Sequence, residues 1–241
     1  MKNELGNWLK FLRQYGPIAR NDNMYDETIM RSARRYKLKP IEFVHPFQGD
    51  VVANFTSSNP VSVILTGTAG DGKTHLCRQV WKTLDGDDKL WEEDNPYLSL
   101  EFAYPADTTS PIDTPGPTRQ VRIHFIRDLS GWSPQQNTEW EPEKEALLQK
   151  FSQSLFDAHF QEIFLIAAND GQLIDSWRRL KDTPHVEKAR QVFEDLLVED
   201  KKELPDVRLK LFNLSRGNSV ELFSEALNAL LCHDGWQELL S

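Results

Sequence analysis

The sequence predicts an α/β fold in which a mainly parallel sheet of about five strands carries helices on both faces. Two observations lead to this fold class. Short apolar segments of strand length alternate along the chain with longer segments whose apolar residues recur at helical spacing. One short segment, IFLIAA at 163–168, is apolar throughout, which is typical of a strand buried on both faces of a parallel sheet.

Size, charge and cysteine usage exclude several classes of protein. The chain has 241 residues, of which 39% are hydrophobic, so it can form one large domain or a domain plus an appendage. A net charge of −9 argues against an overall basic field that would recruit nucleic acid or acidic lipid. Cys77 and Cys232 form neither a disulfide framework nor a zinc pattern. Because the sequence has no signal-peptide stretch and no run of about 18 apolar residues, we expect a cytoplasmic protein that does not engage a membrane.

The first 44 residues predict a helical segment that precedes a main domain at 45–241. Apolar residues at helical spacing predict amphipathic helices over 4–14 and over roughly 25–36. The one basic cluster of the sequence begins within the second helix and continues just after it. Its simplest interpretation is a solvated helix face, and the alternative is contact with a phosphate, a nucleic acid or a partner. The cluster comprises Arg31, Arg34, Arg35, Lys37 and Lys39.

The sequence of the main domain predicts alternating strands and helices, with one stretch that is rich in acidic and turn residues between them. Residues 85–120 are rich in acidic and turn residues, so we expect a loop-dominated insertion in which 98–104 is a candidate strand. The other expected elements are a helix over 46–55, a strand over 61–66, a helix after the glycines that follow, a strand over 121–127, a helix from Pro142, a strand over 163–168, helices near 171–181 and 185–199, a strand over 207–213 and a last helix from about Asn218.

A glycine-rich stretch lies between the first predicted strand of the main domain and the helix that follows it. Residues 67–74, GTAGDGKT, fit the pattern G-x-x-x-x-G-K-[ST] at every position. Glycines allow the backbone to turn its N–H groups around a phosphate, and the following helix adds the positive end of its dipole. The stretch therefore predicts a nucleotide-binding loop, which with the next residue comprises Gly67, Thr68, Ala69, Gly70, Asp71, Gly72, Lys73, Thr74 and His75.

Two side chains of this pattern have expected roles toward ATP and Mg²⁺. The ammonium of Lys73 is expected to reach the β- and γ-phosphates of ATP. The hydroxyl of Thr74 is expected to be a ligand of Mg²⁺, which prefers oxygen donors. The six histidines show no metal-binding spacing, so Mg²⁺ is the one metal ion that the sequence predicts.

On these residues the sequence resembles the P-loop NTPases of the ASCE division, and further features resemble AAA+ and STAND-type ATPases. In that family a second strand ends in an aspartate that holds Mg²⁺, and VRIHFIRD, ending at Asp128, is similar to it. Another strand ends in a polar sensor residue, and IFLIAAN, ending at Asn169, is similar to that element. The resemblance covers about residues 45–231. It implies that Lys73, Asp128 and Asn169 are the catalytic residues. Lys73 would stabilise charge on the β- and γ-phosphates, Thr74 and Asp128 would place Mg²⁺, and Asn169 would contact the γ-phosphate or the attacking water.

The sequence also departs from the family pattern. The family has a glutamate that activates water next to the aspartate, whereas Leu129 and Ser130 follow Asp128 here. The base is therefore open, with Asp170 and Glu139 as candidates from their place in the sequence alone. The helical lid of the family is also missing, so we expect either that it is dispensable or that the chain is part of a longer protein. No arginine finger is evident, because surface charges are the expected role of Arg178, Arg179 and Arg216.

Alternative assignments remain open for several residues. If 98–104 is not a strand, FLIAAND, which ends at Asp170, becomes the magnesium-binding strand in place of the one that ends at Asp128. Both Asp128 and Asn169 also have simpler interpretations, as a cap and as a strand-end turn residue. The adenine is expected, on the resemblance, near 45–47 or 18–23.

We expect Mg²⁺-dependent ATP binding, and ATP hydrolysis that drives a switch or motor. The resemblance implies other protein subunits, further domains or a homo-oligomer as partners, and a role on DNA or in bacterial antiviral defence. The alternatives are a nucleotide-gated interaction module with little turnover and, ranked lower, a small-molecule kinase. GTP is disfavoured because no N-K-x-D motif occurs.

Overall fold

The protein consists of two compact units. The structure, a computed structural model, describes residues 6–15, 25–92, 95–105, 118–134, 138–157, 161–217 and 219–237. One unit comprises Met1–Pro46 together with Asn218–Ser241, and the other comprises Phe47–Gly217. The division differs from the expected domains at two places. The first boundary lies after Pro46 and not after residue 44, and the C-terminal residues group with the N-terminal segment and not with the sheet. The physical reason is a shared apolar core, described below.

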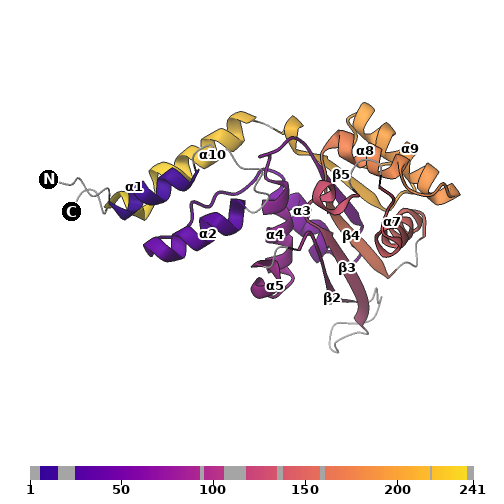
Figure 1. Cartoon of the computed structure of the whole chain (residues 1–241), viewed down its shortest axis with the longest axis horizontal. Helices are drawn as coiled ribbons and strands as arrows, with labels where there is room; N and C mark the ends of the chain where they lie inside the picture. The colour runs from indigo at the N-terminus through magenta and orange to yellow at the C-terminus, as the bar shows by residue number, and fades with distance from the viewer. Residues whose placement is uncertain are drawn as a thin grey trace, which may run out of the picture. The chain divides into compact units, whose positions relative to one another are not determined.

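The larger unit is built on a five-stranded sheet in the order β2-β3-β4-β1-β5. Strands β3, β4, β1 and β5 are parallel, and β2 pairs antiparallel with β3. This confirms the predicted α/β class with a mainly parallel sheet and helices on both faces (Figure 1). The strands are β1 (Ser62–Thr66), β2 (Tyr97–Pro105), β3 (Thr118–Ile126), β4 (Glu162–Ala167) and β5 (Leu209–Asn213).

Side-chain alternation along the strands separates two apolar cores. Val63 and Leu65 of β1 pack with α3, α4 and α5 on one face, whereas Ile64 packs with α6 to α9 on the other. Figure 1 shows the two groups of helices on opposite sides of the sheet. The helices are α3 (Gln48–Thr56), α4 (Lys73–Thr83), α5 (Asp88–Glu92), α6 (Leu129–Trp132), α7 (Pro142–Ser154), α8 (Asp170–Arg178) and α9 (Pro184–Val198).

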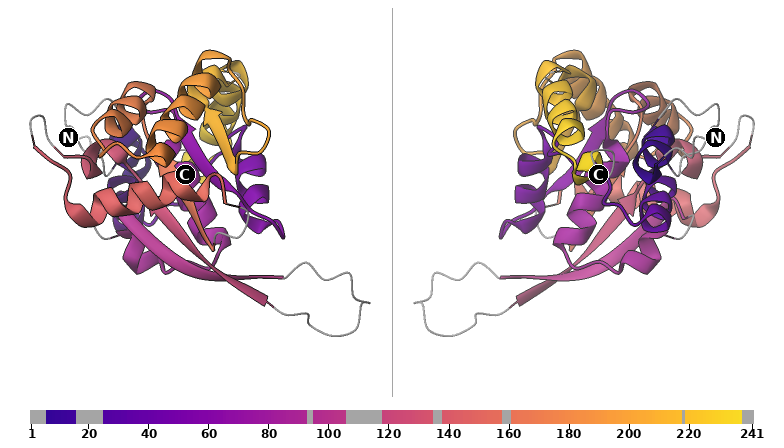
Figure 2. Two further views of the ribbon diagram at one scale, coloured as in Figure 1. Left: turned by 90° about the vertical axis from the view of Figure 1, so that its right-hand side faces the viewer. Right: turned by 90° about the vertical axis from the view of Figure 1, so that its left-hand side faces the viewer.

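The stretch expected to be a loop-dominated insertion carries regular structure where it is described. The candidate strand at 98–104 is confirmed within β2, which pairs with β3 along its whole length, from Tyr97 opposite Ile126 to Pro105 opposite Thr118. Figure 2 shows the two strands as a ribbon that extends beyond the rest of the sheet. The edge position explains why the sequence signal is weak, since β2 buries only part of its side chains. Residues 106–117 lie outside the described part of the chain.

The order of the connections creates a topological switch point between β1 and β4. The helix after β1, α4, lies on one face of the sheet, whereas α8 and α9 after β4 lie on the other. Since β1 and β4 are hydrogen-bonded neighbours, their following segments diverge at the carboxyl ends of the strands. In open α/β sheets such a divergence forms the crevice where ligands bind.

The smaller unit has its own apolar core. Trp8 and Phe11 pack with Ile29 and Ala33, and Leu230 and Trp236 pack against them. The ring of Trp8 also stacks on that of His233, with centroids 4.3 Å apart. These contacts explain why the C-terminal residues belong to this unit. Its elements are α1 (Asn7–Leu12), η1 (Arg13–Tyr15), α2 (Tyr25–Tyr36), α10 (Ser219–Leu231) and η3 (Asp234–Trp236).

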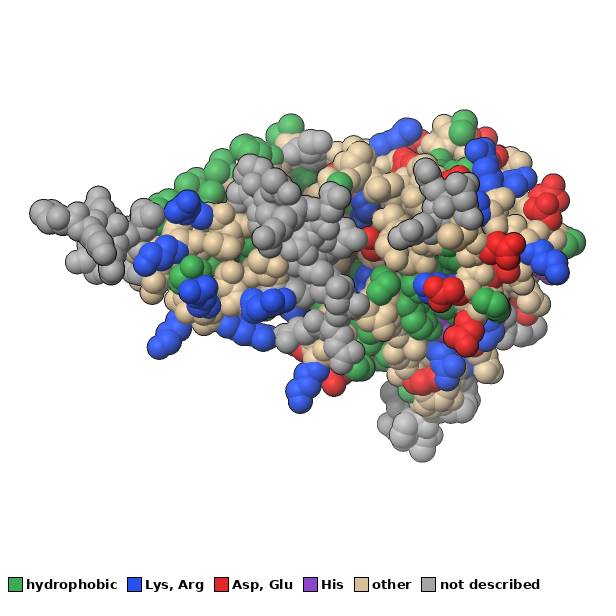
Figure 3. Space-filling view, viewed as in Figure 1, with side chains coloured by type: hydrophobic (Ala, Val, Ile, Leu, Met, Phe, Trp, Pro, Cys, Tyr) green, Lys and Arg blue, Asp and Glu red, His purple; other side chains and the backbone are tan. Residues whose placement is uncertain are grey.

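Two kinds of side chain lie on the surface of the smaller unit. The basic cluster is exposed along and just after α2, and Figure 3 shows basic side chains gathered on that side of the unit. Helix α10 exposes an apolar stripe, with Phe223 and Leu231 each more than 60% exposed. Among the described residues, no helix is long and apolar enough to span a membrane.

A buried histidine joins β2, β3 and β4 in the larger unit. His124 Nδ1 lies 2.8 Å from the hydroxyl of Tyr97, and its Nε2 lies 3.2 Å from a carboxylate oxygen of Glu162. A neutral ring satisfies both contacts, since Nε2–H can donate to the carboxylate while Nδ1 accepts from the phenol. Burial lowers the pKa of His124 to about 4, although the nearby Glu162 acts in the opposite direction.

We predict that His124 makes the protein acid-sensitive. Between its unfolded pKa, about 6.5, and its folded pKa, about 4, the unfolded chain binds a proton that the folded chain does not. The free energy of unfolding should therefore fall with decreasing pH across this window, at a slope that approaches about 1.4 kcal/mol per pH unit. Urea unfolding of wild type and His124→Gln from pH 7.5 to 4.5 checks this. Equal slopes in the two proteins would contradict it.

Candidate functional site

The glycine loop, defined as Gly67–Thr74, lies at the switch point of the sheet. It connects the carboxyl end of β1 to the first turn of α4. Its tip, Thr68 to Gly70, is exposed, whereas Gly67 is buried at the end of the strand. The segment with the strongest chemical signal in the sequence therefore lies where the fold favours ligand binding.

Three glycines give the loop a backbone that other residues rarely adopt. The φ angles of Gly67, Gly70 and Gly72 are 137°, 91° and 87°, all in the region that favours glycine. Gly67 also has no room for a side chain, because an added Cβ would lie 2.5 Å from Oδ2 of Asp71 and 3.1 Å from Oγ of Ser215. The pattern of glycines that the motif requires is thus explained by conformation and by close packing.

A carboxylate inside the loop holds it closed. Asp71 accepts a hydrogen bond from the Thr68 N–H at 2.6 Å and another from the Ser215 hydroxyl at 2.5 Å. Although burial by itself raises the pKa of Asp71, the hydrogen bonds from Ser215 and Thr68 outweigh it and the net pKa is lowered. Ser215, which lies in η2 (Leu214–Arg216) directly after β5, has no local signal in the sequence that would assign it to this site. Only the pairing of β5 with β1 brings it to the loop.

The start of α4 has the features of an anion site. Gly72 is its N-cap and supplies no side chain to the first N–H groups of the helix, and the first turn has no acidic residue. Those N–H groups point out of the helix end, where the dipole is positive. Lys73, the first helical residue, donates to the carbonyl oxygens of Gly67 at 3.0 Å and Thr68 at 2.6 Å. A phosphate at this position would be bound by backbone N–H groups and by one ammonium.

Three carboxylates act on the ammonium of Lys73. Burial lowers the pKa of Lys73, and this effect outweighs the opposing influence of the nearby acidic groups. The opposing carboxylates, in order of decreasing effect, are Asp71, Asp128 and Asp170. The two aspartates that are candidates for binding magnesium therefore both act electrostatically on the same lysine.

Asp128 has a defined structural role at the end of β3. Its Oδ1 accepts hydrogen bonds from the Ser130 N–H at 2.9 Å and from the Ser130 hydroxyl at 2.6 Å. These bonds make Asp128 the N-cap of α6, as its simpler interpretation predicted. Leu129, at the position where the resemblance predicts a glutamate, is fully buried. It can supply no base at that position.

Asn169 and Asp170 follow β4 and open α8. Asn169 is exposed, and its side chain makes no capping hydrogen bond to the helix. Asp170 Oδ2 accepts a long hydrogen bond, 3.4 Å, from Nδ2 of Asn213 at the end of β5. In the described residues, one buried oxygen on each of three neighbouring side chains has no hydrogen-bond partner. These atoms are Thr66 Oγ1, Asp170 Oδ1 and Asn213 Oδ1.

The donor set of the site fits a magnesium nucleotide. Mg²⁺ prefers carboxylate, hydroxyl and water oxygens. Thr74 and Asp128 offer such oxygens, and Asp170 is the alternative to Asp128. The glycine loop and the uncapped helix end offer N–H donors to phosphate. The residues present are therefore compatible with ATP and Mg²⁺, with the loop and Lys73 toward the phosphates and the carboxylates toward the metal.

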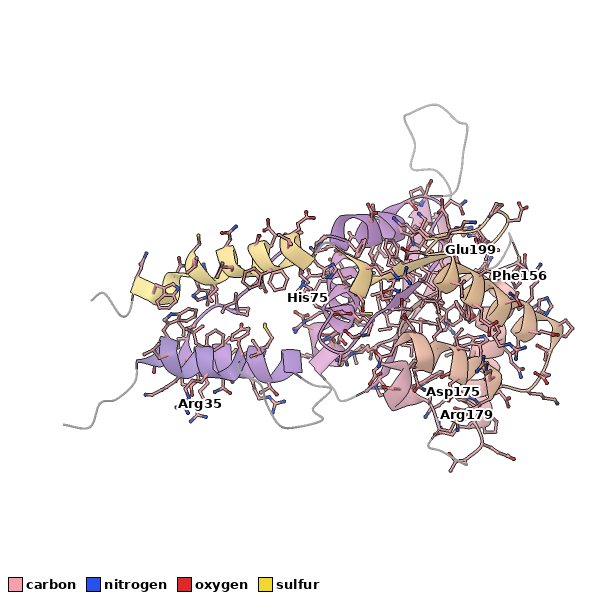
Figure 4. All side chains as sticks on the ribbon, turned by 90° about the horizontal axis from the view of Figure 1, so that it is seen from above. Arg35, His75, Phe156, Asp175, Arg179 and Glu199 are labelled. Carbon is pink, nitrogen blue, oxygen red and sulfur yellow. The ribbon has the colours of Figure 1, made fainter. Side chains whose placement is uncertain are left out.

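The other predicted residues lie apart from these contacts or have partners of their own. His75, labelled in Figure 4, has Nε2 3.3 Å from Nε2 of Gln79, one turn further along α4. Glu139 is exposed in the segment before α7. The three arginines bind within the larger unit, as expected of surface charges: Arg178 pairs with Glu194, Arg179 donates to the carbonyls of Pro134 and Thr138, and Arg216 pairs with Asp200.

The segments expected near an adenine are described only in part. His45 is buried and belongs to the smaller unit, whereas Phe47 begins the larger one. The ring of Phe47 packs edge-on to that of Phe212 in β5, with centroids 5.8 Å apart. Residues 18–23 lie outside the described part of the chain.

Comparison with protein-family models, with curated proteins and with solved structures gave no match to the chain.

We predict that a side chain at Gly67 destabilises the folded protein. In Gly67→Ala the new Cβ would meet Asp71 and Ser215 and would occupy an unfavourable φ, so the free energy of unfolding should fall by about 1–3 kcal/mol. Gly49→Ala is the matched control, because Gly49 lies in α3 with no atom within 4 Å of an added Cβ. Chemical unfolding should place the control within about 1 kcal/mol of wild type. Equal unfolding energies for the two variants would contradict the packing described for the loop.

Proposed function

We propose that this chain is a P-loop NTPase resembling the AAA+ ATPases, and that it binds ATP with Mg²⁺ at the glycine loop. One observation carries the proposal. The loop joins β1 to the uncapped start of α4 at the switch point of the sheet, and a lysine near the two aspartates Asp128 and Asp170 lies in it. Backbone donors, a cation and carboxylates at one place are what a magnesium–phosphate group requires.

The residues of the site take the following parts in this proposal. The N–H groups of the loop and Lys73 stabilise negative charge on the β- and γ-phosphates. Thr74 and Asp128 hold Mg²⁺, with Asp128 preferred to Asp170 because Asn169, directly before Asp170, matches the sensor position of the family. Asn169 is exposed after β4, the strand that pairs with β1, and it contacts the γ-phosphate or the attacking water.

The wider role in the proposal is that of a nucleotide-driven switch or motor. The loop contacts Ser215 through Asp71, and Ser215 lies shortly before residue 218, where the chain passes into the smaller unit. A change of the loop on nucleotide binding therefore acts on the segment that leads to that unit. The exposed basic cluster is the candidate contact for DNA, and partner subunits or a second copy of the chain would receive the motion.

A second candidate function is a nucleotide-gated interaction module without turnover. The observation that favours it is the pair of residues after Asp128. Leu129 is buried in the core and Ser130 bonds to Asp128, so neither provides a base. ATP binding without phosphate release would select this candidate.

We predict that Lys73→Ala weakens ATP binding at least about tenfold, since it removes the one ammonium of the loop. The matched control is Lys82→Ala, which removes the same charge from an exposed position on the same helix. Calorimetry gives the dissociation constants, and phosphate release with and without DNA gives turnover. Unchanged affinity in Lys73→Ala would reject the phosphate-binding role of the loop.

We predict that Asp128→Asn removes the contribution of Mg²⁺ to ATP affinity. Asparagine keeps an oxygen that can cap α6, so the variant changes the charge and preserves the fold. The affinity for ATP should become nearly equal with Mg²⁺ and with a chelator. If Asp170→Asn has this effect and Asp128→Asn does not, the magnesium-binding role belongs to Asp170.

A further inference from the structure

We propose that Asp170 is the catalytic base that takes the proton of the attacking water, with Asn213 as its positioning residue. The inference rests on the proposed function, because it concerns the hydrolysis of ATP bound at the glycine loop. Asp170 would take the place of the glutamate that activates water in the family, which is absent after Asp128.

Three adjacent elements bring the relevant side chains together. Thr66 ends β1 and is paired in register with Asn213, which ends β5. Two residues earlier, Ile64 and Leu211 belong to the core beneath α8 and α9. Because side chains alternate along a strand, Thr66 and Asn213 point to that same face. Asp170, the first residue of α8, meets them there through the hydrogen bond from Asn213.

This cluster is under-satisfied in its hydrogen bonding. Thr66 is fully buried, and its hydroxyl joins Asp170 Oδ1 and Asn213 Oδ1 as buried oxygens with no partner among the described residues. Leaving a polar atom buried without a hydrogen bond costs about 1–3 kcal/mol. Such a cost is typical of functional sites, where a group is kept ready for a substrate. A water with two protons to donate is a chemical match for two acceptor oxygens.

The other carboxylates near Lys73 are occupied differently. Asp71 accepts hydrogen bonds from Thr68 and Ser215, and Asp128 Oδ1 accepts two from Ser130. Oδ2 of Asp71 therefore holds the glycine loop, and Oδ1 of Asp128 holds the start of α6. Asp170 has one long hydrogen bond on Oδ2 and none on Oδ1 in the described part of the chain. Of these three carboxylates, Asp170 is the one that has a buried oxygen without a hydrogen-bond partner among the described residues.

The position of Asp170 fits the geometry of the reaction. It follows β4, the strand adjacent to β1, and its charge acts on Lys73, which the proposal places at the β- and γ-phosphates. The water oxygen forms a bond to the γ-phosphorus, and the bond from that phosphorus to the bridging oxygen breaks. The electron pair of that bond leaves with ADP. The proton of the water passes to Asp170 Oδ1 and then to the released phosphate or to solvent.

The decisive variant is Asp170→Asn, with Asp175→Asn as its matched control. Asp175 lies on the same helix, is exposed, and is labelled in Figure 4. We expect Asp170→Asn to lower kcat for phosphate release about 100-fold or more. It should keep the ATP dissociation constant within about threefold of wild type, since a base adds little to ground-state binding. The control should match wild type in both measurements.

Thermal unfolding without nucleotide is a readout that does not depend on activity. The amide group introduced by Asp170→Asn would bring N–H donors to the acceptor oxygens of the cluster and would remove an unpartnered carboxylate oxygen. The unfolding midpoint of this variant should therefore equal or exceed that of wild type. A midpoint lower by about 3 °C, the effect of a loss of about 1 kcal/mol, would assign Asp170 a structural role and overturn the inference.

Asn213→Ala tests the positioning role and remains informative if Asp170→Asn does not fold. It should lower kcat about tenfold and leave KM unchanged, because Asn213 orients the base and does not touch ATP. Equal changes in kcat and KM, or none, would reject this role.

The failure of the inference is distinguishable from that of the proposed function. If Lys73→Ala weakens ATP binding and Asp170→Asn hydrolyses ATP as wild type does, the base is another group. Wild-type ATP binding without phosphate release would also overturn the inference, whereas the binding site would stand. If Lys73→Ala leaves ATP binding unchanged, the proposed function itself fails.

Discussion

The parallel pairing of β1 with β4 on one side and β5 on the other is the constraint on which the rest of the structure depends. It buries every residue of β1, and the chain first reaches the surface in the glycine loop at the carboxyl end of the strand. The helices that follow β1 and β4 cover opposite faces of the sheet, so the segments that leave these two strands diverge. The glycine loop, Asp170, Asn213 and Ser215 are neighbours because of this pairing, although Thr68 in the loop and Ser215 are 147 positions apart in the sequence.

The charges of Asp71 and Lys73 are both compensated by contacts within the glycine loop and with Ser215. A carboxylate within a loop proposed to bind phosphate would repel that phosphate, yet Asp71 accepts hydrogen bonds from Thr68 and Ser215 and interacts with Lys73. Lys73 in turn donates to carbonyl oxygens of the loop. In the proposed function, a phosphate that enters the loop would replace these internal contacts with its own. The same exchange would alter the contact with Ser215, which links the loop to the end of β5.

The smaller unit shows a different use of apolar and charged residues. One set of apolar side chains builds its core around Trp8, and another set forms the exposed stripe on α10. Its basic cluster lies on α2 and the turn after it, in a chain whose net charge is −9. The fold of this unit therefore presents two chemically distinct surfaces.

By itself the sequence determined the α/β class, the position of the glycine loop and most of the helices and strands, because local patterns encode them. Alternation, helical spacing and the three glycines each act within a few residues. It did not determine the antiparallel pairing of β2, the grouping of α10 with α1 and α2, or the neighbours of Asp170. Those depend on which strands and helices pack together, and Thr66 and Asn213 carry no local signal for their shared cluster. Only the tertiary structure decided that three oxygens from three separate elements are buried together beside the loop, because such proximity arises from strand order and not from spacing along the chain.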